Sequence, residues 1–466
     1  MTKRIITLLS LALLCGSLAA QNRNIANDFA PVQDSLKVLL RERTTVATNP
    51  RISKILRRGG KLDFYFTQDL GDYAWRTEDV KWFRKTLASL FPEEYRKEQL
   101  GDIFMKGTRL ETLVTPSFGN DGKSHSYKYS FSDKGRDAFV TRIGERSFDR
   151  GLDGRIVALW QSHGRYFEEK FGRWEWQRAP CHGTVEDMYT QSYVLPFLIP
   201  MLENAGAYVM TPRERDTQVH EIVADNDPAF TGERSGLMRR SGSYSENGAW
   251  SDAGEGFADA KAAYVLNDNP FTMGTARKAP CILKGEKSEI RWTPTIEEAG
   301  SYAVYVSYKT LENSTSAAHY TVRHASGETE FCVNQKMGGG TWIYLGTFEF
   351  EKGSEGYVSL DNTTPSGHKF VKNSVVTADA VKFGGGVGKI ARGLADEPVE
   401  QYTTSGMPAF AEGAIYWMQW AGVDSTLTRK WDDDYTQDYA ARGAWVGMMA
   451  GGSKANPKQE IGRAHV

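Results

Sequence analysis

The spacing of apolar and polar positions changes several times along the chain. In the segment 78–91, which Pro92 ends, the apolar residues fall on one helical face. These residues are Val80, Phe83, Leu87 and Leu90. The preceding LDFYFTQDL has the composition of a strand. We therefore predict an N-terminal α/β accessory domain over residues 26–145, in which no catalytic group is visible.

From Arg155 the pattern becomes strand, loop, helix and strand. The apolar run 156–160 ends in Gln-Ser-His-Gly, so a buried strand opens into a loop. A helix is expected over 184–205. Pro196 and Pro200 each remove a backbone donor, so this helix must bend or break.

A different pattern follows, with short alternating strands separated by Gly, Asn, Ser and Pro clusters, which is typical of a β-sandwich. We predict a multidomain α/β plus all-β protein, in which a jelly-roll-like β-sandwich is inserted into an α/β domain. The predicted order is a first α/β part at 146–235, a Gly/Ser-rich linker at 236–256, the sandwich at 257–388, a continued α/β part at 389–459 and an artefactual tail at 460–466.

Composition and the amino terminus bear on location and partners. Lys and Arg number 57 against 58 Asp and Glu, which gives no global attraction to nucleic acid. Residues 1–20 combine two basic residues, an apolar stretch and small residues, as a secretory signal peptide does. No later segment has the length of a transmembrane helix. We therefore expect an exported protein that is periplasmic, associated with the outer membrane or extracellular.

Three cysteines follow the predicted cleavage site: Cys181, Cys281 and Cys332. Their spacing matches no metal-binding pattern, and their odd number leaves at least one thiol free. Buried thiols are the expected state, with a Cys281–Cys332 bridge as the alternative.

The segment 155–216 resembles the zinc-dependent N-acetylmuramoyl-L-alanine amidases of the Amidase_3 type. The matching residues are His163-Gly164 at a strand end, Glu186 in TVEDMY, the stretch 193–206 and the turn Pro212–Asp216. The chain departs from the pattern at Arg165, which replaces the family's second glycine. The resemblance implies an amide hydrolase acting on peptidoglycan.

His163 and Glu186 are the predicted metal ligands, for one Zn²⁺ ion. The resemblance places the third ligand and the general base beyond residue 460, so this chain is expected to hold only part of the site. A hydrogen-bonded loop histidine and a carboxylate favoured by the helix dipole are the plain alternatives. Arg213 and Arg215 are substrate-binding candidates, with a structural turn containing ion pairs as the alternative.

The sandwich resembles the carbohydrate-binding-like module of golvesin and bacterial xanthan lyases. The resemblance rests on FTMGTAR, GSYAVYVSYKTLENSTSAAHY, VNQKMGGGTWIYLGTFEFEKG and VTADAVKFGGG. It implies glycan binding. Trp342, Tyr344 and Tyr308 are candidates for stacking on sugar rings, although strand alternation also predicts core positions for them. Asp379 is expected either to line a glycan site or to anchor a strand end.

The predicted function is zinc-dependent cleavage of peptidoglycan by a secreted hydrolase with a glycan-binding module. The partner is peptidoglycan or another polysaccharide. The alternatives are a xanthan-lyase-like polysaccharide lyase and a non-catalytic carbohydrate-binding envelope protein. The zinc content of the full-length protein separates zinc-dependent cleavage from these two alternatives.

Overall fold

The computed structural model describes residues 25–43, 48–114 except 72, 74 and 106, then 138–144, 152, 154–230 and 239–451. The signal-peptide prediction, the predicted tail and the start of the predicted linker lie outside these residues. The chain divides into two compact units, Met1–Asp133 and Lys134–Val466. Each unit is described by itself.

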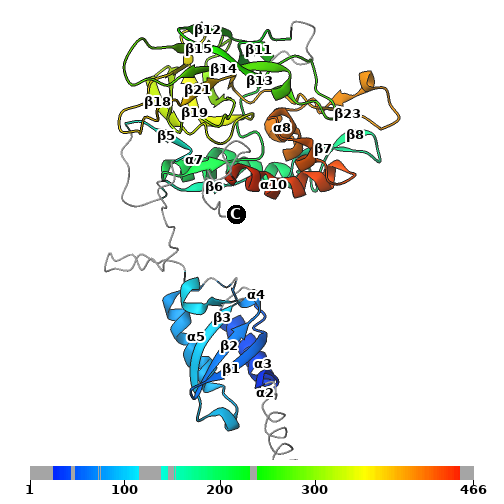
Figure 1. Cartoon of the computed structure of the whole chain (residues 1–466). Helices are drawn as coiled ribbons and strands as arrows, with labels where there is room; N and C mark the ends of the chain where they lie inside the picture. Colours follow the sequence, from blue (N-terminus) through cyan, green and yellow to red (C-terminus); the bar gives the residue numbers. More distant parts are fainter. Residues whose placement is uncertain are drawn as a thin grey trace, which may run out of the picture. The chain divides into compact units, whose positions relative to one another are not determined.

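The first unit is a small α/β domain whose sheet has the strand order β1-β2-β3-β4 (Figure 1). Its strands are β1 (Ile52–Arg58), β2 (Lys61–Phe66), β3 (Gln99–Met105) and β4 (Thr108–Arg109). Its helices are α2 (Ile25–Asp28), α3 (Ala30–Arg43), α4 (Gln68–Gly71) and α5 (Thr77–Ser89), with the short turns η2 (Glu93–Tyr95) and η3 (Leu110–Leu113).

Local sequence explains how this unit closes. Gly59 and Gly60 both have positive φ, which allows the tight turn between antiparallel β1 and β2. Strand β3 then pairs parallel with β2 after the crossover through α5. The predicted helical face is confirmed: Val80, Phe83 and Leu87 are buried in the core of this unit.

The second unit is built largely of β-structure. One sheet has the order β11-β10-β22-β16-β19, a second β12-β15-β20-β17-β18-β5, and a third β13-β14-β21. The strands of the first sheet are β10 (Glu221–Ala224), β11 (Arg239–Ser241), β16 (Gly300–Val306), β19 (Ile343–Phe350) and β22 (Val381–Phe383). Those of the second are β5 (Val140–Arg142), β12 (Ser243–Asn247), β15 (Glu289–Thr293), β17 (Ala318–His324), β18 (Gly327–Val333) and β20 (Tyr357–Asp361). The third contains β13 (Ser251–Gly256), β14 (Gly274–Pro280) and β21 (Val375–Ala378).

Alternating residues of these sheets share one buried core, which gives a β-sandwich-like domain. Val304 and Phe383 belong to the first sheet, and Tyr320 and Leu360 to the second; all four are fully buried in the same cluster. The prediction of a mixed α/β and all-β protein with a sandwich-like module is confirmed at this level.

Two predicted boundaries are wrong. Residues 239–256 are not a linker, because they form β11, β12 and β13, and Tyr244 of β12 packs its ring against the buried Trp292. Serine and glycine are tolerated there because these strands pair at sheet edges. The N-terminal domain also ends before residue 145: β5 pairs with β18, and Phe139 enters the sandwich core.

The segment after β5 contains a βαβ arrangement. Strand β6 (Ile156–Ala158) pairs parallel with β9 (Tyr208–Met210), and α6 (Glu186–Tyr193) and α7 (Ile199–Asn204) lie between them in sequence. The predicted break is confirmed. A π-helical turn, η4 (Val194–Leu198), contains Pro196, and Pro200 lies in the first turn of α7.

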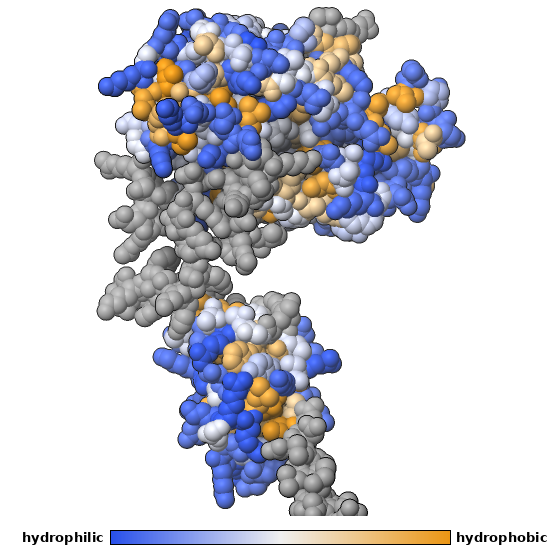
Figure 2. Space-filling view, viewed as in Figure 1, coloured by the Kyte–Doolittle hydropathy of each residue, from blue (hydrophilic) through white to orange (hydrophobic). Residues whose placement is uncertain are grey.

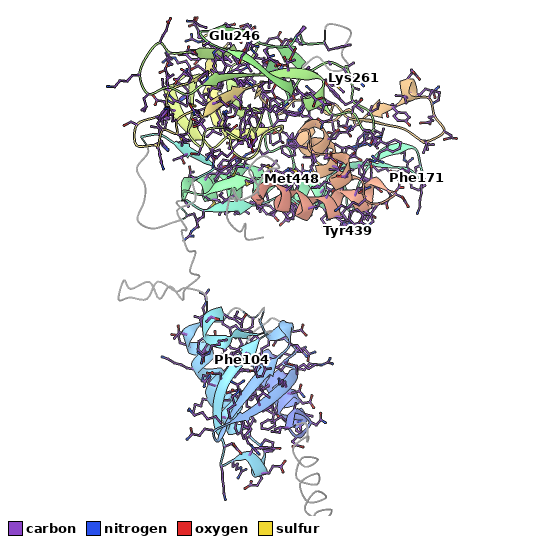
Figure 3. The ribbon with its side chains drawn as sticks, in the orientation of Figure 1. Phe104, Phe171, Glu246, Lys261, Tyr439 and Met448 are labelled. Atoms are coloured by element: carbon purple, nitrogen blue, oxygen red, sulfur yellow. The ribbon has the colours of Figure 1, made fainter. Side chains whose placement is uncertain are left out.

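The second unit contains several further elements. They are the hairpin β7 (Arg165–Glu168) and β8 (Arg173–Trp176), the pair β23 (Ala391–Arg392) and β24 (Thr403–Thr404), the turns η5 (Pro270–Thr272), η6 (Val399–Gln401) and η7 (Ala409–Ala411), and the helices α8 (Ala414–Trp420), α9 (Ser425–Thr428) and α10 (Asp434–Ala450). Phe171 at the hairpin turn and Tyr439 and Met448 of α10 are exposed (Figure 3).

The visible surface mixes polar and apolar residues in both units (Figure 2). Among the helices of the described residues, none is both long and apolar enough to cross a membrane. Within the described residues, no disulfide joins Cys281 and Cys332, so the alternative bridge is not seen there.

Candidate functional site

The His-Gly step follows β6 through a tightly packed turn. Ser162 has a φ of 58°, a conformation that few non-glycine residues adopt, and its hydroxyl lies 2.9 Å from His163 Nδ1. A Cβ at Gly164 would lie 2.5 Å from Arg213 Nη2 and 2.6 Å from the carbonyl oxygen of Glu412. The turn therefore requires glycine at this position and holds His163 in place.

His163 and Glu186 come from separate elements and lie close together. His163 Nδ1 is 3.9 Å from Glu186 Oε1. Arg178 contacts both residues: its Nη2 lies 3.0 Å from His163 Nε2, and its Nε lies 3.9 Å from Glu186 Oε2. The sequence interpretation did not include Arg178, which follows β8 and is far from any motif. The ligand roles of His163 and Glu186 stay predictions.

The electrostatics of this cluster favour a neutral imidazole. Burial and then the positive charge of Arg178 lower the pKa of His163. A neutral imidazole can bind a metal or accept a proton. A zinc site needs three protein ligands, however, and no group of three or more His, Cys, Asp or Glu side chains in the described part of the chain is arranged to hold a metal. The described residues therefore do not by themselves fit zinc.

The two arginines predicted to bind substrate are structural. Arg213 is 1% exposed and donates from Nη1 to the carbonyl oxygens of Gln161 at 3.1 Å and of His163 at 2.5 Å. Arg215 donates to Glu203 at 2.7 Å, and its guanidinium lies 3.8 Å from the ring centroid of Tyr344. Their donors are turned toward the protein: those of Arg213 to the residues that follow β6, and those of Arg215 to α7 and β9. Arg215 forms an ion pair with Glu203, whereas Arg213 bonds to backbone carbonyl oxygens and to no carboxylate among the described residues.

The aromatic side chains predicted to stack on sugars pack against other parts of the protein. Trp342 is 3% exposed and Tyr308 is fully buried, so no face of either ring is open to solvent. Tyr344 is partly buried under Arg215, and its hydroxyl lies 2.9 Å from Thr347 Oγ1. Trp342 and Tyr308 therefore take the core positions that strand alternation also predicts, and the stacking role of Tyr344 stays a prediction.

Asp379 anchors a strand. It is 2% exposed, its carboxylate accepts a hydrogen bond from the Phe257 amide at 3.0 Å, and its carbonyl accepts one from Trp292 Nε1 at 3.0 Å. Burial raises the pKa of Asp379 to about 7. Of the two roles left open by the sequence, the buried anchor is the one observed.

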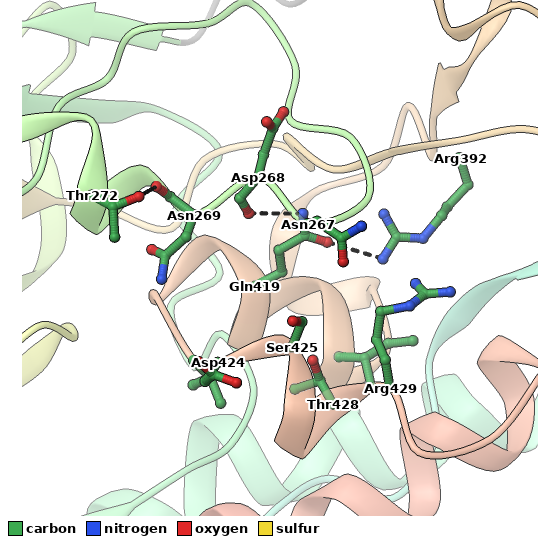
Figure 4. A pocket seen from close by; sticks show the side chains of 12 residues that line it. Asn267, Asp268, Asn269, Thr272, Arg392, Gln419, Asp424, Ser425, Thr428 and Arg429 are labelled. Atoms are coloured by element: carbon green, nitrogen blue, oxygen red, sulfur yellow. Dashed lines mark hydrogen bonds between the residues drawn. The ribbon is translucent and has the colours of Figure 1, made fainter.

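A polar pocket of about 220 Å³ offers a second candidate site (Figure 4). It lies between the loop that leads into η5 and the helices α8 and α9. Its polar lining includes Asn267, Thr272, Arg392, Gln419, Thr428 and Arg429. Arg392 and Arg429 lie on the same side of it (Figure 4). Hydrogen-bonding side chains thus meet here from parts of the chain more than a hundred residues apart.

Sequence reasoning missed this pocket for a physical reason. The only local signal is the polar run Asn267-Asp268-Asn269 before Pro270, which indicates a turn. The loop is fixed to α8 by Gln419, whose Nε2 donates to the carbonyl oxygens of Val265 at 2.6 Å and Asp268 at 3.1 Å. That contact joins residues with no common motif.

Comparison with known proteins places the sandwich in a recognised class. Residues 239–385 match the family described as the Golvesin C-terminal domain. These residues contain most strands of the three sheets, including part of the segment predicted as a linker. The carbohydrate-binding-like module inferred from sequence is thereby supported, whereas this match lends no support to an amidase.

Two of the similar proteins are named as xanthan lyases. A xanthan lyase of Bacillus sp. (strain GL1) is 43% identical over 103 residues, which is 22% of this chain and 10% of that protein. The chain thus spans about a tenth of the length of this curated relative. A solved structure of Paenibacillus xanthan lyase shares 25% identity with a TM-score of 0.26, and the match covers 35% of this chain and 13% of that one.

Proposed function

We propose that this chain is a carbohydrate-binding protein that holds polysaccharide on its second unit. The observation that carries the proposal is the match of residues 239–385 to the Golvesin C-terminal domain, together with 43% identity to a segment of a xanthan lyase. A segment shared with an enzyme that acts on a polysaccharide is more consistent with a binding role than with the whole enzyme's chemistry. The lyase reaction itself is therefore not part of the proposal.

The polar pocket beside α8 and α9 is the proposed binding site. Sugars present hydroxyl groups in several directions, and this pocket offers amide, hydroxyl and guanidinium groups from opposite sides. Its residues come from both the sandwich and the helical segment, so binding requires the second unit as a whole. The polysaccharide is peptidoglycan or another glycan outside the cytoplasm, in keeping with the predicted signal peptide.

Affinity electrophoresis of the whole chain tests the proposal. Gels containing purified peptidoglycan, xanthan or a neutral glucan should retard the chain in at least one case. Thr272→Trp, which places an indole at the exposed rim of the pocket, should abolish the retardation. Ser354→Trp, on an exposed loop that does not line the pocket, is the matched control. Migration unchanged by every polysaccharide would contradict the proposal.

A second candidate function is zinc-dependent amide hydrolysis of peptidoglycan. The observation that favours it is the 3.9 Å separation of His163 Nδ1 and Glu186 Oε1. The described residues offer two donors rather than three, and Arg178 lies against the imidazole. Measurement of zinc in the purified chain decides the matter. One zinc per chain that is lost in His163→Ala supports this function, and a zinc-free chain that still binds glycan excludes it for this chain.

A further inference from the structure

We propose that the pocket beside α8 and α9 selects acidic sugars, with the Arg429 guanidinium binding the sugar carboxylate. The inference rests on the proposed glycan-binding function and names its ligand class. Guanidinium and carboxylate groups form paired, parallel hydrogen bonds, which combine affinity with a fixed orientation. The geometry around Arg429 leaves its donors available for such a pair.

Arg429 has no hydrogen-bond partner in the described part of the chain. Its Nη1 lies 4.0 Å from Asp434 Oδ1, beyond hydrogen-bond distance. Asp434 is already engaged, because its Oδ2 accepts hydrogen bonds from Arg392 Nε at 3.1 Å and from the Tyr416 hydroxyl at 2.8 Å. Asp434 thus forms a long ion pair with Arg429 through Oδ1, while its other oxygen is held by Arg392 and Tyr416.

Arg392 differs from Arg429 in this respect. Its Nη2 donates to Gln419 Oε1 at 3.0 Å and its Nη1 to the Ala391 carbonyl oxygen at 3.2 Å, in addition to the bond with Asp434. Arg392 thus contributes positive charge to the pocket but is held in place by the protein. The Arg429 guanidinium makes only the long ion pair with Asp434 and no hydrogen bond within the described residues.

The acidic residues of the lining do not neutralise Arg429. Asp268 Oδ1 lies 2.6 Å from Lys261 Nζ, and its Oδ2 accepts a hydrogen bond from the Val265 amide. Asp424 caps helix α9, where its Oδ1 accepts hydrogen bonds from the amide and hydroxyl of Thr426. Figure 4 shows the Asp268 carboxylate directed away from Arg429.

The placement of Arg429 carries a cost that an anion would relieve. Its side chain is 29% exposed, and burial together with the charge of Arg392 lowers its pKa. The group stays charged at neutral pH. The charges of Asp434 and Glu169 offset part of this cost. What the guanidinium lacks is hydrogen-bond acceptors, and a bound carboxylate supplies them.

The rest of the lining suits the remainder of a sugar. Asn267 is exposed at the rim, and Ser425 and Thr428 lie on α9. Within the described residues, none of these three side chains takes part in a hydrogen bond. They therefore offer an amide and two hydroxyl groups to a monosaccharide whose carboxylate is held by Arg429.

Isothermal titration calorimetry of the whole chain with polygalacturonate and with its methyl-esterified form tests the inference. The two probes differ in the charge of their carboxyl groups. Polygalacturonate should bind about tenfold more tightly, and Arg429→Gln should reduce its affinity to that of the ester. Lys430→Gln removes the same charge from an exposed neighbouring residue and should leave both affinities unchanged.

The outcomes separate the two proposals. Equal binding of the two probes, or equal effects of Arg429→Gln and Lys430→Gln, would overturn the acidic-sugar inference and leave glycan binding intact. A chain that binds no polysaccharide at all would remove both. If Arg429→Gln lowers the melting temperature, Arg429→Lys carries the comparison. Lysine keeps the charge but lacks the planar guanidinium group. The inference is supported if this variant binds polygalacturonate more weakly than the wild type does, but more tightly than the wild type binds the methyl ester.

Discussion

At the scale of single residues, burial decides what each charged side chain does. Arg213 and Glu412 are both almost fully buried. Arg213 donates hydrogen bonds to carbonyl groups that follow β6, so its role is structural. Glu412 accepts a hydrogen bond from Ser405 at 2.5 Å, and burial raises the pKa of its carboxyl group to about 8. A buried carboxyl group of this kind links stability to pH.

We predict that Glu412 makes the second unit less stable as pH rises. In the unfolded chain its carboxyl group titrates near its ordinary value of 4.5, whereas in the folded chain it keeps its proton until about pH 8. Its stabilising contribution is therefore full below about pH 4.5 and is lost progressively between the two values. The free energy of unfolding should fall by about 1 kcal/mol per pH unit in this window, as urea titrations can measure.

Glu412→Gln should flatten this pH dependence. Glu400→Gln, at an exposed glutamate, is the control and should leave the slope unchanged. Asp216, whose pKa burial raises to about 6, contributes a slope of the same sign up to that pH. Asp379, whose pKa burial raises to about 7, extends this slope. The decisive quantity is thus the difference in slope between the wild type and Glu412→Gln above pH 7, and an unchanged slope in the variant would refute the assignment.

At the scale of elements, local sequence signals predicted most boundaries of helices and strands. At some positions, pairing with a neighbouring strand gave a different result. Pro196 and Pro200 break the helical segment where each lacks a donor, as predicted. The run Ser243–Asn247 has the polarity of a linker, but β15 supplies its backbone hydrogen bonds along the whole strand. Edge strands can be polar because only one side of them is packed.

An aspartate caps the N-terminus of helix α10. The Asp433 carboxylate accepts a hydrogen bond from the Thr436 amide at 2.7 Å, which satisfies a donor at the first turn. Asp433→Ala should lower the free energy of unfolding by about 1 kcal/mol. The neighbouring Asp432→Ala removes the same charge from an exposed residue and is the control. Equal losses in the two variants, measured by urea unfolding, would show that charge rather than capping matters.

At the scale of the whole molecule, the chain consists of two units with separate cores. Phe64 and Phe83 belong to the core of the first unit, and Val304 and Tyr320 belong to that of the second. Because each unit buries its own apolar residues, each has the means to fold without the other. The first unit carries no site identified here, so its contribution to function is a separate question from glycan binding.

We predict that a fragment of residues 25–133 folds alone. Phe64→Ala removes a fully buried ring and should lower the free energy of unfolding of this fragment by about 3–5 kcal/mol, whereas Lys61→Ala at an exposed position should have little effect. In the whole chain, Phe64→Ala should shift one unfolding transition and leave the second unchanged. A single shared transition, followed by fluorescence in urea, would contradict the independence of the units.

The sequence by itself determined the elements and the module class. Periodicity and prolines located the helices, and the motifs of 271–386 indicated the carbohydrate-binding-like sandwich. These features depend on neighbours along the chain. The tertiary structure decided which polar and aromatic residues are available to a ligand. Trp342 and Arg215 were reasonable candidates by type but became buried, whereas Arg429 lay in no motif. Availability depends on what packs against a side chain, and those contacts come from residues distant in sequence.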